Sequence, residues 1–86
     1  MRIVFHKNFE KRYQKLAEVM KLKIKERNIL FEQDPYHPIL NNHSLTSQYT
    51  GYRIINITGD IRIIYKLLDN EVALFSEIGS HSLLYK

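Results

Sequence analysis

The feature that most constrains the fold is a change of hydrophobic period near residue 52. From there on, three segments are rich in β-branched and aromatic residues: 52–57, 61–68 and 72–78. Their separators, Thr-Gly-Asp at 58–60 and Asp-Asn-Glu at 69–71, have the composition of hairpin turns. A three-stranded antiparallel meander is therefore predicted for the C-terminal part of the chain.

The N-terminal part has a different pattern. "RIVF" at 2–5 predicts a short strand, and Asn8 is a candidate helix cap before an apolar stripe that runs to Met20. A second helix is predicted over 22–33, ending where Asp34 precedes Pro35. A strand, two helices and then a three- to four-stranded antiparallel sheet indicate the α+β class.

Length and composition limit the number of domains, the cellular compartment and the class of partner that can be expected. The chain has 86 residues, which suits a single domain over 1–86, and its formal net charge is +4. It has no cysteine, no apolar stretch of signal-peptide length and no membrane-length segment. We therefore expect a cytoplasmic protein with no membrane partner. The basic charge favours a nucleic-acid or acidic protein partner.

A long polar loop, residues 34–50, separates the helices from the meander. Loops of this length in small domains are usually functional or held by packed anchors. The expected anchors are Ile39, Leu40 and Leu45. The loop also carries His43, and a lone histidine in a loop is usually a solvated residue rather than a catalytic one.

Alternation along the strands sorts the side chains into two faces. Two-residue turns place Arg53, Arg62 and Lys66 together on one face, with Ile55, Ile57, Ile64, Ala73, Phe75 and Glu77. The other face is almost purely apolar and should pack on the helices; it holds Tyr52, Ile54, Ile61, Ile63, Tyr65, Leu67, Val72 and Leu74. The charged face is either an ordinary half-solvated surface with an Arg62–Glu77 pair or a cationic surface for phosphates.

Groups able to carry chemistry lie near the strand ends: Asp60 in the first turn, His43 in the loop, and His81 and Tyr85 after Gly79. Each also has a plain structural interpretation, such as turn chemistry for Asp60. There is no metal-ligand spacing, Gly-rich phosphate loop or nucleophile elbow. No metal and no cofactor are expected.

The stretch "NNHSLTSQYTGYRIINITGDIRIIYKL…IGSHSLLY" resembles the C-terminal half of the RelE/ParE superfamily of bacterial toxins, and most closely its YafQ-type messenger-RNA interferases. The shared pattern is H-x-L, then G-Y-R, then G-D-x-R at a hairpin, an apolar strand ending in Tyr, and a terminal G-[ST]-H-x-x-[LI]-[FY].

The resemblance implies the toxin of a type II toxin–antitoxin pair, a metal-independent endoribonuclease that cuts messenger RNA on the ribosome and is silenced by a cognate antitoxin. It implies catalytic roles for His81, Asp60, His43 and Tyr85. Arg62 matches an arginine common in the RelE group, and we expect Arg62, Arg53 and Lys66 to bind RNA.

Two positions depart from the YafQ-type pattern. Those toxins often carry an acid and a histidine shortly after the G-Y-R arginine, where this chain has Ile54 and Asn56. Face sorting places both toward the helices, and Asn56 cannot transfer a proton. Two alternatives therefore stay open: a non-catalytic ParE-like module that inhibits gyrase, and an antitoxin-binding remnant without toxicity.

Overall fold

The computed structural model describes residues 1–80 and Leu84. In chain order its elements are β1 (Arg2–Phe5), α1 (Lys7–Gln14), α2 (Glu18–Gln33), η1 (Pro38–Leu40), β2 (His43–Ser44), η2 (Ser47–Tyr49), β3 (Arg53–Asn56), β4 (Ile61–Leu67) and β5 (Val72–Ser80). Within these residues, no helix has both the length and the apolar character that a membrane span requires.

The strands form one five-stranded sheet in the order β1-β5-β4-β3-β2. The meander β3-β4-β5 is antiparallel, as predicted, and β2 adds an antiparallel edge. At the opposite edge β1 pairs in parallel with β5. The α+β prediction is confirmed, with the sheet wider than expected because both flanking segments join it.

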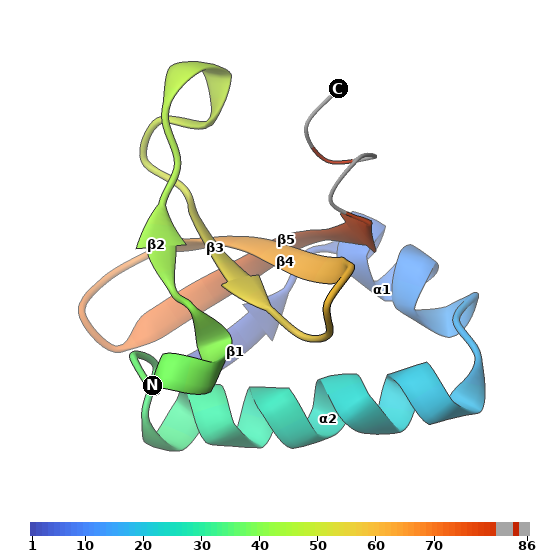
Figure 1. Ribbon diagram of the computed structural model, residues 1–86. Helices are drawn as coiled ribbons and strands as arrows, with labels where there is room; N and C mark the ends of the chain where they lie inside the picture. The colour runs from blue at the N-terminus through green and yellow to red at the C-terminus, as the bar shows by residue number, and fades with distance from the viewer. Residues whose placement is uncertain (81–83, 85–86) are drawn as a thin grey trace.

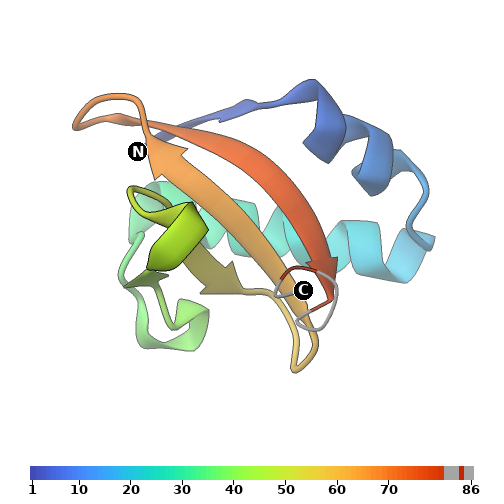
Figure 2. The ribbon, with the colours of Figure 1, turned by 90° about the horizontal axis from the view of Figure 1, so that it is seen from above.

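The molecule has two layers, as Figures 1 and 2 show. In Figure 1 α2 runs below the sheet and α1 lies beside β5, while the loop between β2 and β3 rises on the upper side. The upper surface, which we call the open face, therefore carries no helix of α1 or α2. A loop or a ligand can reach the open face without displacing the core.

The boundary between the helices differs from the sequence prediction. α1 ends at Gln14 and α2 begins at Glu18, so Met20 belongs to the second helix rather than the first. The N-cap of α1 is His6, whose Nδ1 accepts a hydrogen bond from the backbone N of Asn8 at 3.1 Å. The predicted Asn8 cap is wrong because the histidine ring already satisfies that amide. The predicted stop at Gln33 is confirmed.

The core lies between the helices and the sheet and is built around aromatic rings. Phe31 meets Tyr65 and Phe75 edge-on, with ring centroids 5.0 and 5.1 Å apart. Phe9 from α1 closes the cluster against Phe75 at 5.9 Å. Such edge contacts add to the stabilisation that burial of these large side chains provides.

The register of the first hairpin overturns the predicted sorting of faces. Ile57 N donates to Ile61 O at 2.9 Å, so the turn has three residues, 58–60, and not two. Arg53 consequently pairs with Tyr65, and Asn56 with Arg62. A one-residue change of register moves every side chain of a strand to the opposite face.

Several residues therefore lie on the face opposite to the one predicted. Ile55, Ile57, Ala73 and Phe75 are buried in the helix-side core, and Arg53 shares their side of the sheet. Ile54 instead packs in a small second cluster, with Tyr52 against it. Arg62 is opposite Gly79, while Glu77 is opposite Ile64, so the predicted direct Arg62–Glu77 pairing is wrong.

The long loop is ordered by two of its three expected anchors. Leu40 is fully buried in the main core, and Leu45 packs on the second cluster. Ile39 is 47% exposed and is not an anchor. The loop also contributes β2, which pairs His43 with Ile54 and Ser44 with Arg53.

Candidate active site on the open face

The open face has an apolar floor. Ile54 and Ile64 are cross-strand partners, and together with Leu84 they form a buried cluster on this side of the sheet. Leu45, Tyr49 and Tyr52 pack around the cluster. Because Leu84 is 4% exposed, the part of the C-terminal segment that the structure describes is anchored on the open face.

His43 lies at the edge of this floor. The pairings His43–Ile54, Ile54–Ile64 and Ile64–Glu77 form one row across four strands. Directly opposed residues in a sheet share a face, so the exposed His43 ring belongs to the open face. With adjacent strands about 4.8 Å apart, His43 and Ile64 are separated by about 10 Å of backbone.

Arg62 lies at one end of the face, next to the turn. Its Nη1 donates to Thr58 O at 2.9 Å and to Ile61 O at 3.4 Å, which holds the half-buried guanidinium over the hairpin. Both hydrogen bonds use the same nitrogen of a group that has five N–H donors. Asn56 is its direct cross-strand partner. A fixed guanidinium on an accessible face suits phosphate binding.

Asp60 is exposed in the same turn. Its backbone N donates to Thr58 Oγ1 at 3.3 Å, and Ile61 N donates to the same oxygen at 3.1 Å. The threonine hydroxyl therefore shapes the turn, and the Asp60 carboxylate is not what closes it.

Lys66 occupies the other end of the face. Arg62, Ile64 and Lys66 alternate along β4, so the two cations are about 13 Å apart along the strand. The Lys66 ammonium lies 5.5 Å from the centre of the Tyr52 ring, and Tyr49 meets that ring edge-on at 6.3 Å. This end of the face therefore combines a positive charge with two tyrosine rings, the kinds of group that RNA-binding sites use.

Arg53 is held on the other side of the sheet. Its Nε donates to Asn42 Oδ1 at 2.8 Å, and its guanidinium lies 5.4 Å from the centre of the Tyr36 ring. Asn42 Nδ2 in turn donates to Tyr65 Oη at 2.7 Å and to Pro35 O at 2.8 Å. Burial raises the pKa of Tyr65 above its usual value of 10.0. That Arg53 binds RNA stays a prediction, although its observed partners belong to the protein.

The structure thus brings His43, Arg62 and Lys66 to one face, with Asp60 in the turn beside Arg62, and separates Arg53 from them. His81 and Tyr85 lie outside the described residues. Sequence reasoning missed Asn42 and Tyr49, and placed Tyr52 on the helix side. The adjacent asparagines Asn41 and Asn42 are a sequence signal for an ordered turn before His43, because asparagine readily adopts the left-handed conformation.

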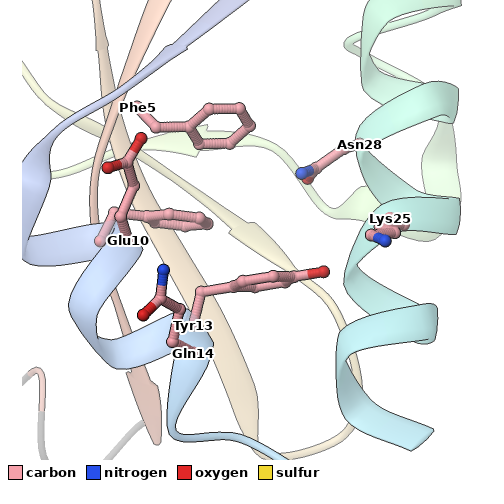
Figure 3. Close-up of a pocket in the computed structure, with 7 residues that line it drawn as sticks. Phe5, Glu10, Tyr13, Gln14, Lys25 and Asn28 are labelled. Atoms are coloured by element: carbon pink, nitrogen blue, oxygen red, sulfur yellow. The ribbon is translucent and has the colours of Figure 1, made fainter. Parts of the chain in front are cut away.

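A separate cleft lies on the helix side, between α1 and α2. It encloses about 520 Å³, and Figure 3 shows Phe5 and Tyr13 along one wall, with Lys25 and Asn28 on α2 opposite. Asn28 Oδ1 is buried and, among the described residues, has no hydrogen-bond partner. The cleft contains none of the predicted catalytic residues.

Residues 1–86 match the family described as "Bacterial toxin of type II toxin-antitoxin system, YafQ". No curated protein sequence is similar enough to count as a match. The chain belongs to the YafQ family of toxins from type II toxin–antitoxin systems.

Solved structures agree with this assignment. The crystal structure of YafQ from E. coli strain BL21(DE3) is 25% identical, with a TM-score of 0.82 over 100% of both chains. YafQ in the E. coli DinJ–YafQ complex is also 25% identical, with a TM-score of 0.70 over 100% of both chains. The Staphylococcus aureus YoeB–YefM complex contains a chain with the same fold, at 22% identity and a TM-score of 0.75, covering 94% of this chain and 97% of that one.

Proposed function

We propose that this toxin is a metal-independent endoribonuclease that cleaves messenger RNA on the ribosome, with the open face as its RNA site. The observation that carries the proposal is the placement of His43, Arg62 and Lys66 on one face, around a floor on which Leu84 is seated. Family membership supports the toxin class on which the proposal depends.

The proposed cleavage reaction uses the 2′-hydroxyl group of the RNA itself as the nucleophile. The 2′-oxygen attacks the adjacent phosphorus while its proton passes to a base, and the bond from phosphorus to the 5′-oxygen breaks. The electron pair of that bond stays on the 5′-oxygen, which takes a proton from an acid. The products are a 2′,3′-cyclic phosphate and a 5′-hydroxyl, so no water, metal or oxidant enters the step.

The residues take complementary roles in this mechanism. His81 is the main proton carrier, because imidazole titrates near neutral pH. Arg62 binds the phosphate as negative charge develops on it, and Asp60 orients the site or serves as a base. Tyr85 stacks on a base next to the cut. Lys66 adds a positive charge along the path of the bound RNA.

The cognate antitoxin is the second proposed partner. Relatives have been solved as the DinJ–YafQ and YoeB–YefM complexes. We propose that this chain is silenced in the same way, in the cytoplasm where ribosomes are. Co-expression with the adjacent reading frame should restore growth and give a co-purifying complex. A product that neither binds nor rescues would contradict the pairing.

Mapping the 5′ ends of cellular transcripts after induction tests the enzymatic proposal. We expect new 5′-hydroxyl ends within minutes, in register with the reading frame, and their loss in His81→Ala and His43→Ala. The matched control is His37→Asn, because His37 caps η1 and asparagine is also a good cap. Intact transcripts with DNA damage would instead support gyrase inhibition, and unaffected growth would support a remnant.

A further inference from the structure

The cleft between α1 and α2 has the size and composition of a small-molecule site. Its volume of about 520 Å³ lies within the range of ligand pockets, about 300–1,000 Å³. Its lining combines aromatic rings with a few polar groups, which include Glu10, Lys25 and Asn28. Ligand pockets have this composition because apolar walls provide affinity and a small number of polar groups provide selectivity.

Three aromatic rings form one wall of the cleft. Phe9 is 2% exposed and forms the back of this wall, and the ring centres of Phe5 and Tyr13 lie 5.1 and 6.3 Å from its own. Tyr13 Oη donates to Lys21 O at 3.3 Å, which holds the ring against α2. Phe5 and Tyr13 therefore offer ring surface to a planar ligand that enters the cleft from solvent (Figure 3).

Asn28 provides the polar group on the opposite wall. Figure 3 shows its carboxamide pointing from α2 into the cleft. Its Oδ1 is buried without a hydrogen-bond partner in the part of the chain that the structure describes, and such an oxygen requires an explanation. The terminal torsion of asparagine is soft, so a small rotation can turn Oδ1 to a ligand in the cleft.

A carboxamide selects for one kind of ring edge. It places an acceptor, Oδ1, beside a donor, Nδ2. Adenine presents the complementary pair, an N6 amine that donates and an N7 that accepts, and asparagine commonly recognises adenine through both. Guanine presents two acceptors, O6 and N7, at the same edge, so it leaves Oδ1 without a partner.

Lys25 provides a positive charge at the same wall. It lies three residues before Asn28 on α2, a spacing that places both side chains on one face of the helix. Its neighbours Lys23 and Arg27 both reach Glu26, at 3.9 and 3.6 Å, whereas Lys25 forms no ion pair with any described residue. The ammonium is therefore available to an anionic group of a ligand, and the net charge of +4 favours such a ligand.

We infer that this cleft binds a free adenine mononucleotide. The base stacks on Phe5 and Tyr13, its N6–N7 edge pairs with the Asn28 carboxamide, and its phosphate lies toward Lys25. Rings alone would accept any apolar molecule, whereas a carboxamide and an ammonium on one wall require a ring with a donor–acceptor edge and a negative charge. The inference goes beyond RNA cleavage, because the cleft contains none of the residues proposed for that reaction.

Calorimetric titration of the full chain with adenosine monophosphate (AMP), guanosine monophosphate (GMP) and adenosine tests the assignment. We expect AMP to bind roughly fivefold or more tightly than GMP, because a bidentate pair discriminates bases by this amount. Adenosine should bind about two- to fivefold more weakly than AMP, as expected for loss of one exposed charge contact. A chain that binds none of the three, or that binds AMP and GMP equally, overturns the inference.

Two variants locate the bound base. Asn28→Leu should fold, because it removes an unsatisfied buried oxygen, and it should lower AMP affinity roughly fivefold or more and abolish the preference over GMP. Phe5→Leu keeps an apolar side chain at a ring that is 40% exposed and should weaken AMP roughly fivefold or more through lost stacking. AMP affinity that is unchanged in both variants places the nucleotide elsewhere and overturns the inference.

A third variant locates the phosphate. Lys25→Gln should weaken AMP about two- to fivefold and leave adenosine unchanged. The matched control is Lys23→Gln, because Lys23 lies on the same helix but does not line the cleft. Equal losses for AMP in the two lysine variants would mean that the effect is one of overall charge, which overturns the placement of the phosphate at Lys25.

A further comparison separates a free nucleotide from an RNA strand and from the proposed endoribonuclease. An oligoadenylate that binds more tightly than AMP and also loses affinity in Asn28→Leu would make the occupant an RNA strand and overturn the assignment. Asn28→Leu should cleave transcripts like the wild type. A chain that binds AMP through Asn28 but leaves all transcripts intact refutes only the proposed function, and a chain that cleaves transcripts but does not bind AMP refutes only this inference.

Discussion

Asn56 on β3 and Arg62 on β4 are direct cross-strand partners, so their side chains lie next to each other on the open face. The alternation of side chains along the strand predicts that Asn56 faces the helices, away from any bound RNA. The observed register makes it a neighbour of the proposed phosphate-binding guanidinium. Position 56, where YafQ-type toxins often have a histidine, therefore lies in the proposed RNA site, and this chain has an asparagine there.

Asn56→His should raise the cleavage rate. An imidazole at this position can exchange a proton beside Arg62, which a carboxamide cannot do, and general acid–base groups contribute about 10²- to 10⁴-fold. We expect at least a tenfold faster appearance of 5′-hydroxyl ends after induction. Asn70→His, outside the face, is the control. A rate equal to that of the wild type would mean that position 56 does not meet the scissile phosphate.

Arg62→Lys should reduce cleavage strongly while leaving the fold intact. Lysine keeps the charge but loses the planar donors that bind two phosphate oxygens at once, and loss of one transition-state donor costs about 10²- to 10³-fold. Single-turnover cleavage by the purified toxin measures the loss, and circular dichroism checks the fold. Lys66→Arg keeps a cation at the other end of the face and should cleave close to normally.

Leu84→Ala should slow cleavage more than it destabilises the domain. Among the residues that the structure describes, Leu84 packs with the small open-face cluster and not with the main core. Its truncation removes the apolar contact that seats Leu84 against Ile54 and Ile64 on the sheet. We expect at least a tenfold loss of cleavage and a modest decrease in melting temperature. Leu68→Ala, at a leucine that is 53% exposed, is the control and should change neither.

Tyr65→Phe should alter how stability depends on alkaline pH. Burial raises the pKa of Tyr65 above 10.0 in the folded state. The unfolded chain therefore loses this proton first, and its contribution to stability, fully present below pH 10.0, is lost as the pH rises through the folded pKa. Denaturant unfolding from neutral to alkaline pH should show a decline that is shallower in Tyr65→Phe. Tyr49→Phe, at a ring that packs on the open-face cluster away from Tyr65, is the control and should keep the wild-type slope.

Asn28→Leu should stabilise the protein. The buried Asn28 Oδ1 has no partner among the described residues, and such an oxygen costs about 1–3 kcal/mol. A leucine of similar size adds apolar contact to the aromatic wall of the cleft in Figure 3. We expect a gain of about 1 kcal/mol, or roughly 4–8 °C in melting temperature. Gln33→Leu, at the exposed end of α2, should give no such gain.

Part of this protein could be predicted from its sequence because the signals are local. The change from helical to strand period, the proline after Asp34 and the two turn sequences predicted the α+β order and the antiparallel meander. The motifs from His43 to Tyr85 indicate the toxin family, and the family match over residues 1–86 confirms it. Turn preferences, proline sterics and hydrophobic periodicity depend on residues that are close in sequence, so they can be recognised without the folded structure.

What only the tertiary structure decided is which side chains meet. One additional residue in the 58–60 turn separates Arg53 from Arg62 and moves Asn56 onto the open face. A turn sequence permits loops of two or three residues, and the choice follows from which face can bury its side chains against Phe9, Phe31 and Phe75. The hydrogen bond from Arg53 Nε to Asn42 Oδ1 joins residues 11 positions apart in the chain, and only the folded sheet brings them together.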